Sequence, residues 1–91
     1  MAKRNLLHLM YRHFVGDTKG WIEVEKNELT RLGILSSIST SSYIKGNYIY
    51  LDEDLDSSLF LCSLGYDPEF TKVAINDTYF DNYEQFKESL Q

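Results

Sequence analysis

An acidic run in the second half of the chain has the spacing that most suggests ligand chemistry. Asp52, Asp54 and Asp56 alternate as do the residues that open a calcium-binding EF-hand loop. The rest of that loop is missing, because Ser57 stands where the sharp turn needs glycine and Ser63 stands where a bidentate glutamate is required. We therefore expect an acidic helix start, which capping and the helix dipole favour, and neither a metal site nor a cofactor.

The two histidines and the single cysteine are the other residues with catalytic potential. Nothing in the sequence places His8 or His13 beside Cys62, so no nucleophile–base pair can be assembled. Cys62 lies on the apolar side of an expected helix, where a free cysteine behaves as a small hydrophobic residue. The five glycines are scattered and form no phosphate-binding loop. We expect that the chain is not an enzyme.

The aromatic residues indicate a binding surface. The chain has seven Tyr, five Phe and one Trp. Strand alternation predicts that four of them share the sheet face that points away from the helices: Trp21, Tyr48, Tyr50 and Phe70. If this face is open, it marks a partner site or a homodimer interface. The alternative is that the N-terminal segment or the last helix covers it.

The same rings could stack on nucleic-acid bases. Four basic residues are expected near them: Lys19, Lys26, Arg31 and Lys45. Because these cations are few and no RNA-binding sequence motif accompanies them, nucleic-acid binding is the alternative function and not the first.

Charge is unevenly distributed along the chain. Residues 1–50 carry seven Lys and Arg against four acids, a net +3, and residues 51–91 carry two against ten, a net −8. The acidic part would repel phosphate, which disfavours uniform nucleic-acid binding. Its carboxylates either form a solvated face or imitate phosphates in the basic groove of a partner protein. The candidates for the second role are Asp52, Glu53, Asp54, Asp56, Asp67 and Glu69.

A few elements must position these side chains. Segment 5–15 fits either a helix or a strand, and we favour a strand because the loop 16–20 leads into another one. Further strands are expected at 21–24, at 43–51 with a turn or bulge at 45–47, and at 70–75. Helices are expected at 26–32 ending at Gly33, from 52–54 to Gly65, and at 80–90, with a serine-rich loop at 36–42. The residues expected to face the helices are Ile22, Val24, Ile49, Leu51, Val73 and Ile75.

This order of elements predicts one α+β domain over residues 1–91. We expect two layers, in which a mixed, mostly antiparallel sheet of about four strands packs with two to three helices. The apolar stretch Leu6–Met10 is too short and too polar for a signal peptide or a membrane span, so we expect a cytoplasmic protein that does not contact membranes.

Three short patches follow one another between residues 20 and 62. They are Gly20-Trp21-Ile22-Glu23-Val24 leading to Leu32-Gly33-Ile34, then Ile38-Ser39 and Ser42-Tyr43 with Gly46, and last Tyr50-Leu51-Asp52-Glu53-Asp54-Leu55-Asp56 followed by Phe60-Leu61. In this order they resemble a family of small, uncharacterised proteins encoded by bacteriophages and mobile elements. A Gly-Trp strand, a Leu-Gly-Ile helix end and a Leu-Glu-Glu-Asp helix start recur in that family, and Asp52 departs from the last motif. The resemblance implies a source but no assigned activity.

Size, charge and this resemblance together suggest a protein-binding module. We expect a phage-type accessory protein that modulates or inhibits a host or defence protein through the aromatic face, the acidic surface or both.

Overall fold

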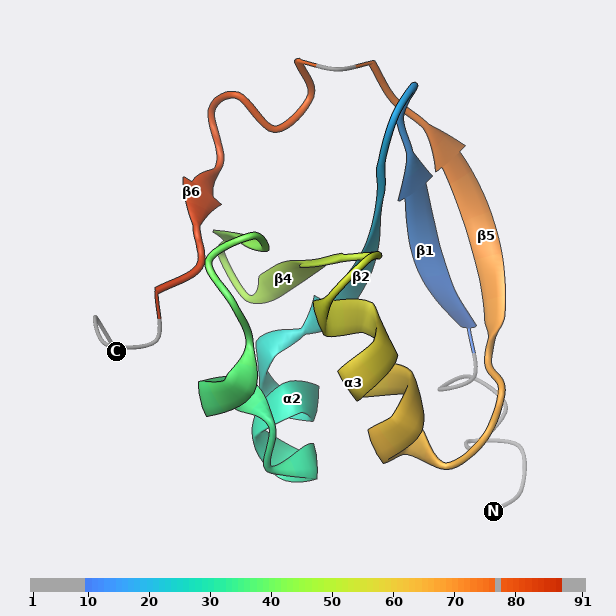
Figure 1. Cartoon of the computed structure of the whole chain (residues 1–91), viewed down its shortest axis with the longest axis vertical. Helices are drawn as coiled ribbons and strands as arrows, with labels where there is room; N and C mark the ends of the chain where they lie inside the picture. Colours follow the sequence, from blue (N-terminus) through green and yellow to red (C-terminus); the bar gives the residue numbers. More distant parts are fainter. Residues whose placement is uncertain (1–9, 77, 88–91) are drawn as a thin grey trace.

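Six strands of the described chain form one mixed sheet (Figure 1). The computed structural model describes residues 10–76 and 78–87. The elements are β1 (Met10–Val15), β2 (Gly20–Glu25), α2 (Lys26–Leu32), the 3₁₀ turn η1 (Leu35–Ser37), β3 (Tyr43–Lys45), β4 (Tyr48–Asp52), α3 (Asp56–Leu64), β5 (Glu69–Ala74) and β6 (Glu84–Gln85). The small α+β class is confirmed, but the sheet has six strands where about four were expected.

The strand order is β5-β1-β2-β4-β3-β6. Two hairpins, β1–β2 and β3–β4, supply the antiparallel centre, and β2 pairs with β4 between them. β5 returns after α3 and pairs parallel with β1 over six residue pairs. The favoured strand in segment 5–15 is confirmed for residues 10–15, whereas residues 5–9 lie outside the described part.

The two α-helices of the described residues each end at a glycine. Gly33 and Gly65 follow α2 and α3 with φ of 77° and 79°, a left-handed conformation that L side chains rarely adopt. The start of α3 was predicted too early. Asp52 is the last residue of β4, and its Oδ1 accepts hydrogen bonds from the N–H groups of Asp54 at 2.7 Å and Leu55 at 3.2 Å. These bonds stabilise a turn that separates strand from helix.

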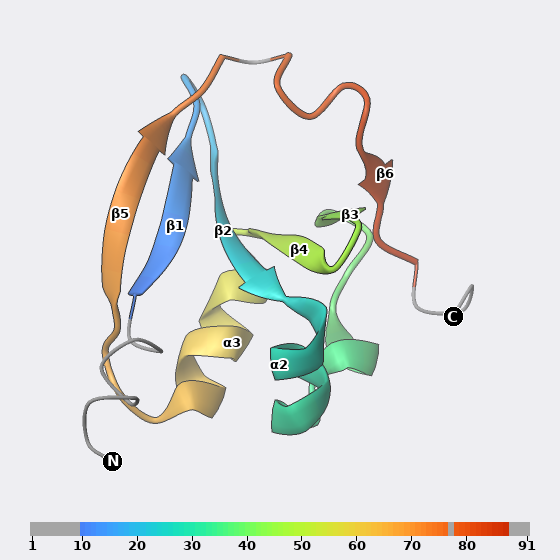
Figure 2. The ribbon, with the colours of Figure 1, turned by 180° about the vertical axis from the view of Figure 1, so that it is seen from behind.

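The helices α2 and α3 lie side by side on one face of the sheet, the helix face (Figure 2). The main core lies between them and the central strands. Its buried side chains are Ile22, Val24, Leu29, Ile34, Ile38, Ile49, Leu51, Phe60 and Phe86. The assignment of Ile22 and Val24 in β2, and of Ile49 and Leu51 in β4, to the helix face is therefore confirmed.

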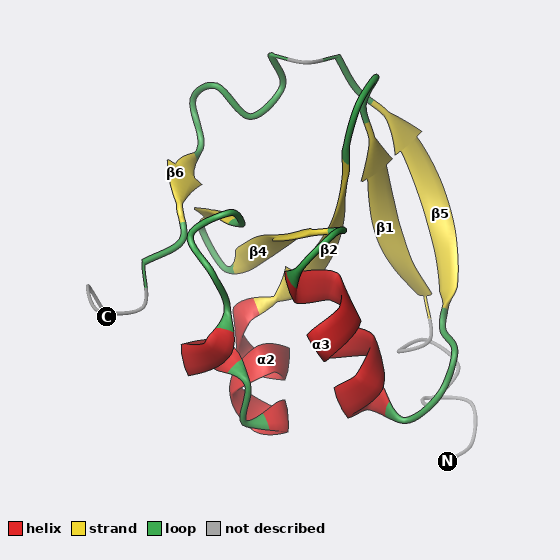
Figure 3. Ribbon diagram, viewed as in Figure 1, coloured by secondary structure: helices red, strands yellow, loops and turns green. Residues whose placement is uncertain are grey.

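The opposite, aromatic face carries a second core around Phe80. The chain between β5 and β6 crosses this face as turns and loop (Figure 3), so the helix predicted at 80–90 is wrong for the described residues up to 87. β6 instead pairs with β3. The aromatic residues of this segment pack on both sides of the sheet. Phe80 and Tyr83 lie on the aromatic face, whereas Phe86 belongs to the main core. Residues 88–90 of that predicted helix lie outside the described part.

The face assignment of β5 was also wrong. Val73 and Ile75 pack with the aromatic cluster and not with the helices. Phe70 pairs in register with Tyr11, whose ring contacts Phe60 of α3. The parallel register with β1 sets these faces, and the sequence of β5 alone carries no information on that register.

Replacing Phe80 with alanine should remove the centre of the aromatic cover. Its ring centroid lies 4.7 Å from that of Trp21, 5.0 Å from Tyr43 and 5.3 Å from Tyr50. We expect Phe80→Ala to lower the free energy of unfolding by about 3–5 kcal/mol and to shift the emission of Trp21, the one tryptophan of the sequence, to the red. Urea unfolding and native-state fluorescence measure both. Native emission unchanged from wild type would contradict this packing.

Candidate binding site

The pairing between β1 and β2 stops early. It comprises only the pairs Val15–Gly20, Phe14–Trp21 and His13–Ile22. Beyond His13, residues 10–12 pair with β5 alone, and beyond Ile22, residues 23–25 pair with β4 alone. The two strands are therefore close at their shared loop and diverge toward the helices (Figure 1).

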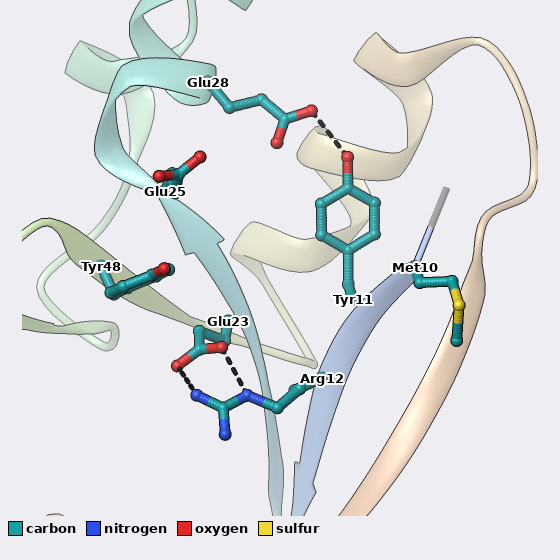
Figure 4. A pocket seen from close by; sticks show the side chains of 7 residues that line it. All are labelled: Met10, Tyr11, Arg12, Glu23, Glu25, Glu28 and Tyr48. Atoms are coloured by element: carbon teal, nitrogen blue, oxygen red, sulfur yellow. Dashed lines mark hydrogen bonds and ion pairs between the residues drawn. The ribbon is translucent and has the colours of Figure 1, made fainter. Parts of the chain in front are cut away.

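A pocket of about 220 Å³ lies where the strands diverge (Figure 4). We call it the acidic fork. Its lining residues come from both strands, from β4 and from the first turn of α2: Met10, Tyr11, Arg12, Glu23, Glu25, Glu28 and Tyr48.

An ion pair between the exposed Arg12 and the buried Glu23 spans the base of the fork. Arg12 Nε and Nη2 donate to the two carboxylate oxygens of Glu23, each at 2.7 Å, a bidentate geometry that is stronger than a single contact. The Tyr50 hydroxyl donates to Glu23 Oε2 at 2.9 Å. The Glu23 side chain is 7% exposed. The hydrogen bond to Glu23 raises the pKa of Arg12, so the guanidinium stays protonated.

A second carboxylate is held on the opposite side of the fork. The Tyr11 hydroxyl donates to Glu28 Oε2 at 2.6 Å, while the Tyr11 ring meets that of Phe60 edge-on at 5.2 Å. Burial and then the Glu28 hydrogen bond raise the pKa of Tyr11, so the phenol remains protonated. Arg31, one helical turn further along, reaches Glu28 only at 3.8 Å and is mostly exposed.

Glu25 is the carboxylate that the fork leaves available. It is exposed, stands at the N-cap of α2, and its side chain caps no helix N–H. The lining holds three glutamates and one arginine, which leaves a net charge of −2. Met10 and Tyr48 flank the opening and are 54% and 40% exposed. This arrangement suits a cation with an apolar stem.

The structure separates the four predicted aromatic site residues. Trp21 and Tyr50 lie under Phe80. The aromatic face is therefore covered at these two residues, and the cover is a loop instead of the expected N-terminal segment or last helix. Tyr48 is exposed at the rim of the fork. Phe70 lies on the other face of the sheet, where its ring centroid is 5.9 Å from that of His13.

Four of the six predicted acidic site residues, those between positions 52 and 56, divide in the same way. Glu53 and Asp54 are exposed, and Glu53 pairs with His13 Nε2 at 3.0 Å. Asp52 is 1% exposed and forms an ion pair with Lys19, which raises the pKa of that lysine. Asp56 is 4% exposed. The carboxylates of Asp52 and Asp56 are thus engaged inside the chain.

Asp56 organises the serine-rich loop. Its oxygens accept hydrogen bonds from the Ser39 N–H at 3.1 Å, the Ser39 hydroxyl at 2.8 Å and the Ser42 hydroxyl at 2.5 Å. Ser42 Oγ in turn accepts the N–H of Asp52 at 2.9 Å. The loop is therefore pinned to the start of α3 by a buried carboxylate, which is costly to bury unless it is paired in this way.

Most of the fork was not predicted from the sequence. The alternation in β2 did place Glu23 on the face of Trp21, and Glu25 continues that pattern. Two glutamates on an otherwise aromatic face were the available signal. The contributions of Tyr11, Arg12 and Glu28 depend on where β1 separates from β2, which is a tertiary property. No group of three or more His, Cys, Asp or Glu converges as metal ligands within residues 10–76 and 78–87.

The fold and this pocket define a small α+β protein with an acidic cleft at the end of a short strand ladder. No protein-family model, no curated protein and no solved structure matches the chain. Over the described ranges, neither α-helix has the length and apolar composition needed to cross a bilayer.

The free energy of unfolding should distinguish the buried Asp56 from the exposed Asp54. Asp56→Asn replaces an acceptor of three donor groups with an amide, so we expect it to lower the free energy of unfolding by about 2–3 kcal/mol. The exposed Asp54→Asn is the matched control and should change it by less than about 0.5 kcal/mol. Urea unfolding measures both variants. Equal effects would contradict the buried role of Asp56.

Alkaline pH should destabilise the protein through Tyr11 and Tyr50. Burial, then hydrogen bonding to a glutamate, raises the pKa of both in the folded state. Their stabilising contribution is therefore complete below the ordinary tyrosine pKa of about 10 and is lost as the pH rises above it. We expect the free energy of unfolding to fall above about pH 10 and to fall less steeply in Tyr11→Phe. Unfolding curves across this range test the claim, and identical slopes would contradict it.

Proposed function

We propose that this chain is a protein-binding module whose acidic fork receives an arginine or lysine side chain of a partner protein. The observation that carries the proposal is the charge imbalance of the pocket, where three glutamates face one arginine. Because Arg12 and Glu23 neutralise each other through a bidentate contact, Glu25 and Glu28 provide the remaining negative charge of the lining.

The shape of the fork supports a basic side chain over a free inorganic cation. Met10 and Tyr48 offer exposed apolar surface at the entrance, against which the methylene stem of lysine or arginine can pack. The charged head can then contact Glu25, which lines the same pocket and whose carboxylate caps no N–H of α2. Guanidinium is the better match, since it forms planar two-point contacts with carboxylates.

The resemblance to bacteriophage and mobile-element proteins supplies the class of partner. A small protein of net charge −5 that binds a basic side chain suits an accessory protein that modulates or inhibits a host or defence protein. The alternative, nucleic-acid binding through an aromatic face, has less support, because Phe80 covers Trp21 and Tyr50.

Charge reversal in the fork tests the proposal. A capped arginine peptide titrated into the isotope-labelled protein should shift the amide resonances of residues 10–12 and 23–28. Glu25→Lys should weaken this binding about tenfold, equivalent to about 1.4 kcal/mol. Asp54→Lys, an equal charge change at an exposed acid outside the fork, is the matched control.

The two variants distinguish binding at the fork from binding at the turn formed by residues 52–54. Loss of binding in Glu25→Lys alone supports the fork, whereas loss in Asp54→Lys alone would transfer the site to the turn at 52–54. A natural partner should be captured from host lysate by the wild type and by Asp54→Lys, but not by Glu25→Lys. Capture that disappears after nuclease treatment would favour the nucleic-acid alternative.

A further inference from the structure

One edge of β5 pairs with no other strand in the described part of the chain. β5 is six residues long, and five of them are exposed. The open edge of a strand presents N–H and C=O groups that can extend the sheet into another chain. We propose that β5 pairs antiparallel with β5 of a second copy of this chain, and so forms a two-fold symmetric homodimer with a continuous sheet.

Alternate residues of β5 supply the backbone groups for this pairing. The Ile75 N–H donates to the Val15 carbonyl at 3.0 Å, so the backbone of Ile75 is directed toward β1. Successive residues of a strand direct these groups to opposite edges. The groups that point away from β1 are therefore those of Phe70, Lys72 and Ala74.

Symmetry restricts how the two strands can align. A two-fold axis perpendicular to the sheet keeps each face on its own side, so residues that pair must be an even number of positions apart. Only two such registers overlap over five residues of β5. The register centred on Lys72 sets two ammonium groups directly opposite each other, which is destabilising. We therefore assign the register centred on Thr71.

The Thr71-centred register brings unlike side chains together. Phe70, which is 38% exposed, lies opposite the partner subunit's Lys72 in each half of the dimer. The lysine stem and ammonium can pack on that ring. Each of the two Phe70–Lys72 pairs forms two backbone hydrogen bonds, because the N–H and C=O groups of both residues point away from β1. Glu69 meets the partner's Val73, so no like charges face each other.

Disulfide trapping tests both the dimer and its register. In this register the two Thr71 residues form a non-hydrogen-bonded pair, with Cα atoms about 4.5 Å apart, within the range that a disulfide spans. The background is Cys62→Ser, because Cys62 is exposed and is the one cysteine of the sequence. Under mild oxidation, Thr71→Cys should form a covalent dimer, and the matched control Lys72→Cys should form several-fold less. Preferential linking of Lys72→Cys, or of neither, would overturn the proposal.

A second variant tests the pairing without cysteine. Lys72→Pro removes an outward N–H and leaves the bonds between β5 and β1 intact, because those use the alternate residues. We expect the wild type to sediment as a dimer at high concentration and Lys72→Pro as a monomer. Trp21 fluorescence and melting temperature confirm that the variant is folded. A monomeric wild type up to millimolar concentration, or a folded variant that still dimerises, would overturn the proposal.

Discussion

The early end of the β1–β2 ladder is the constraint on which the rest of this structure depends. β1 pairs with β5 at all six of its positions but with β2 at only three. β2 continues along β4 and runs directly into α2. Where β1 and β2 diverge, side-chain hydrogen bonds replace those between peptide groups. Arg12 donates to Glu23 on one side of the gap, and Tyr11 donates to Glu28 on the other. Because these hydrogen bonds use two of the three carboxylates that line the pocket, the strand separation and part of the acidity of the pocket have one origin.

Both faces of the central sheet are covered, and this limits where a partner can bind. The two helices cover one face, and Phe80 with its neighbours covers Trp21 and Tyr50 on the other. Two accessible parts of the described sheet are the gap between β1 and β2 and the outer edge of β5. The fork offers charge and a small volume, whereas β5 offers peptide groups in a row. These surfaces suit different partners, a basic side chain for the first and an identical strand for the second.

Local signals in the sequence predicted local structure well. The alternation in β2, the α2 helix ending at Gly33 and the stop at Gly65 were all recovered, because each depends on neighbours in the chain. The helix predicted from residue 80 is wrong for residues 80–87, because aromatic residues three apart fit a helix and also fit a loop that crosses a sheet. Burial of Asp56 could not be predicted, since its partners Ser39 and Ser42 lie 17 and 14 positions away. The fork depends on where a ladder stops, which no local pattern encodes.

The most direct test of this account is the set of cross-strand Hα–Hα contacts between β1 and β2, measured by nuclear Overhauser spectroscopy. Gly16 donates its N–H to the Lys19 carbonyl at 2.8 Å, which makes His13–Ile22 a close, non-hydrogen-bonded pair. We expect a strong contact between these two Hα atoms and none between those of Tyr11 and Val24, the next pair of that kind. A strong Tyr11–Val24 contact would show that the ladder continues, and would contradict both the separation of the strands and the pocket between them.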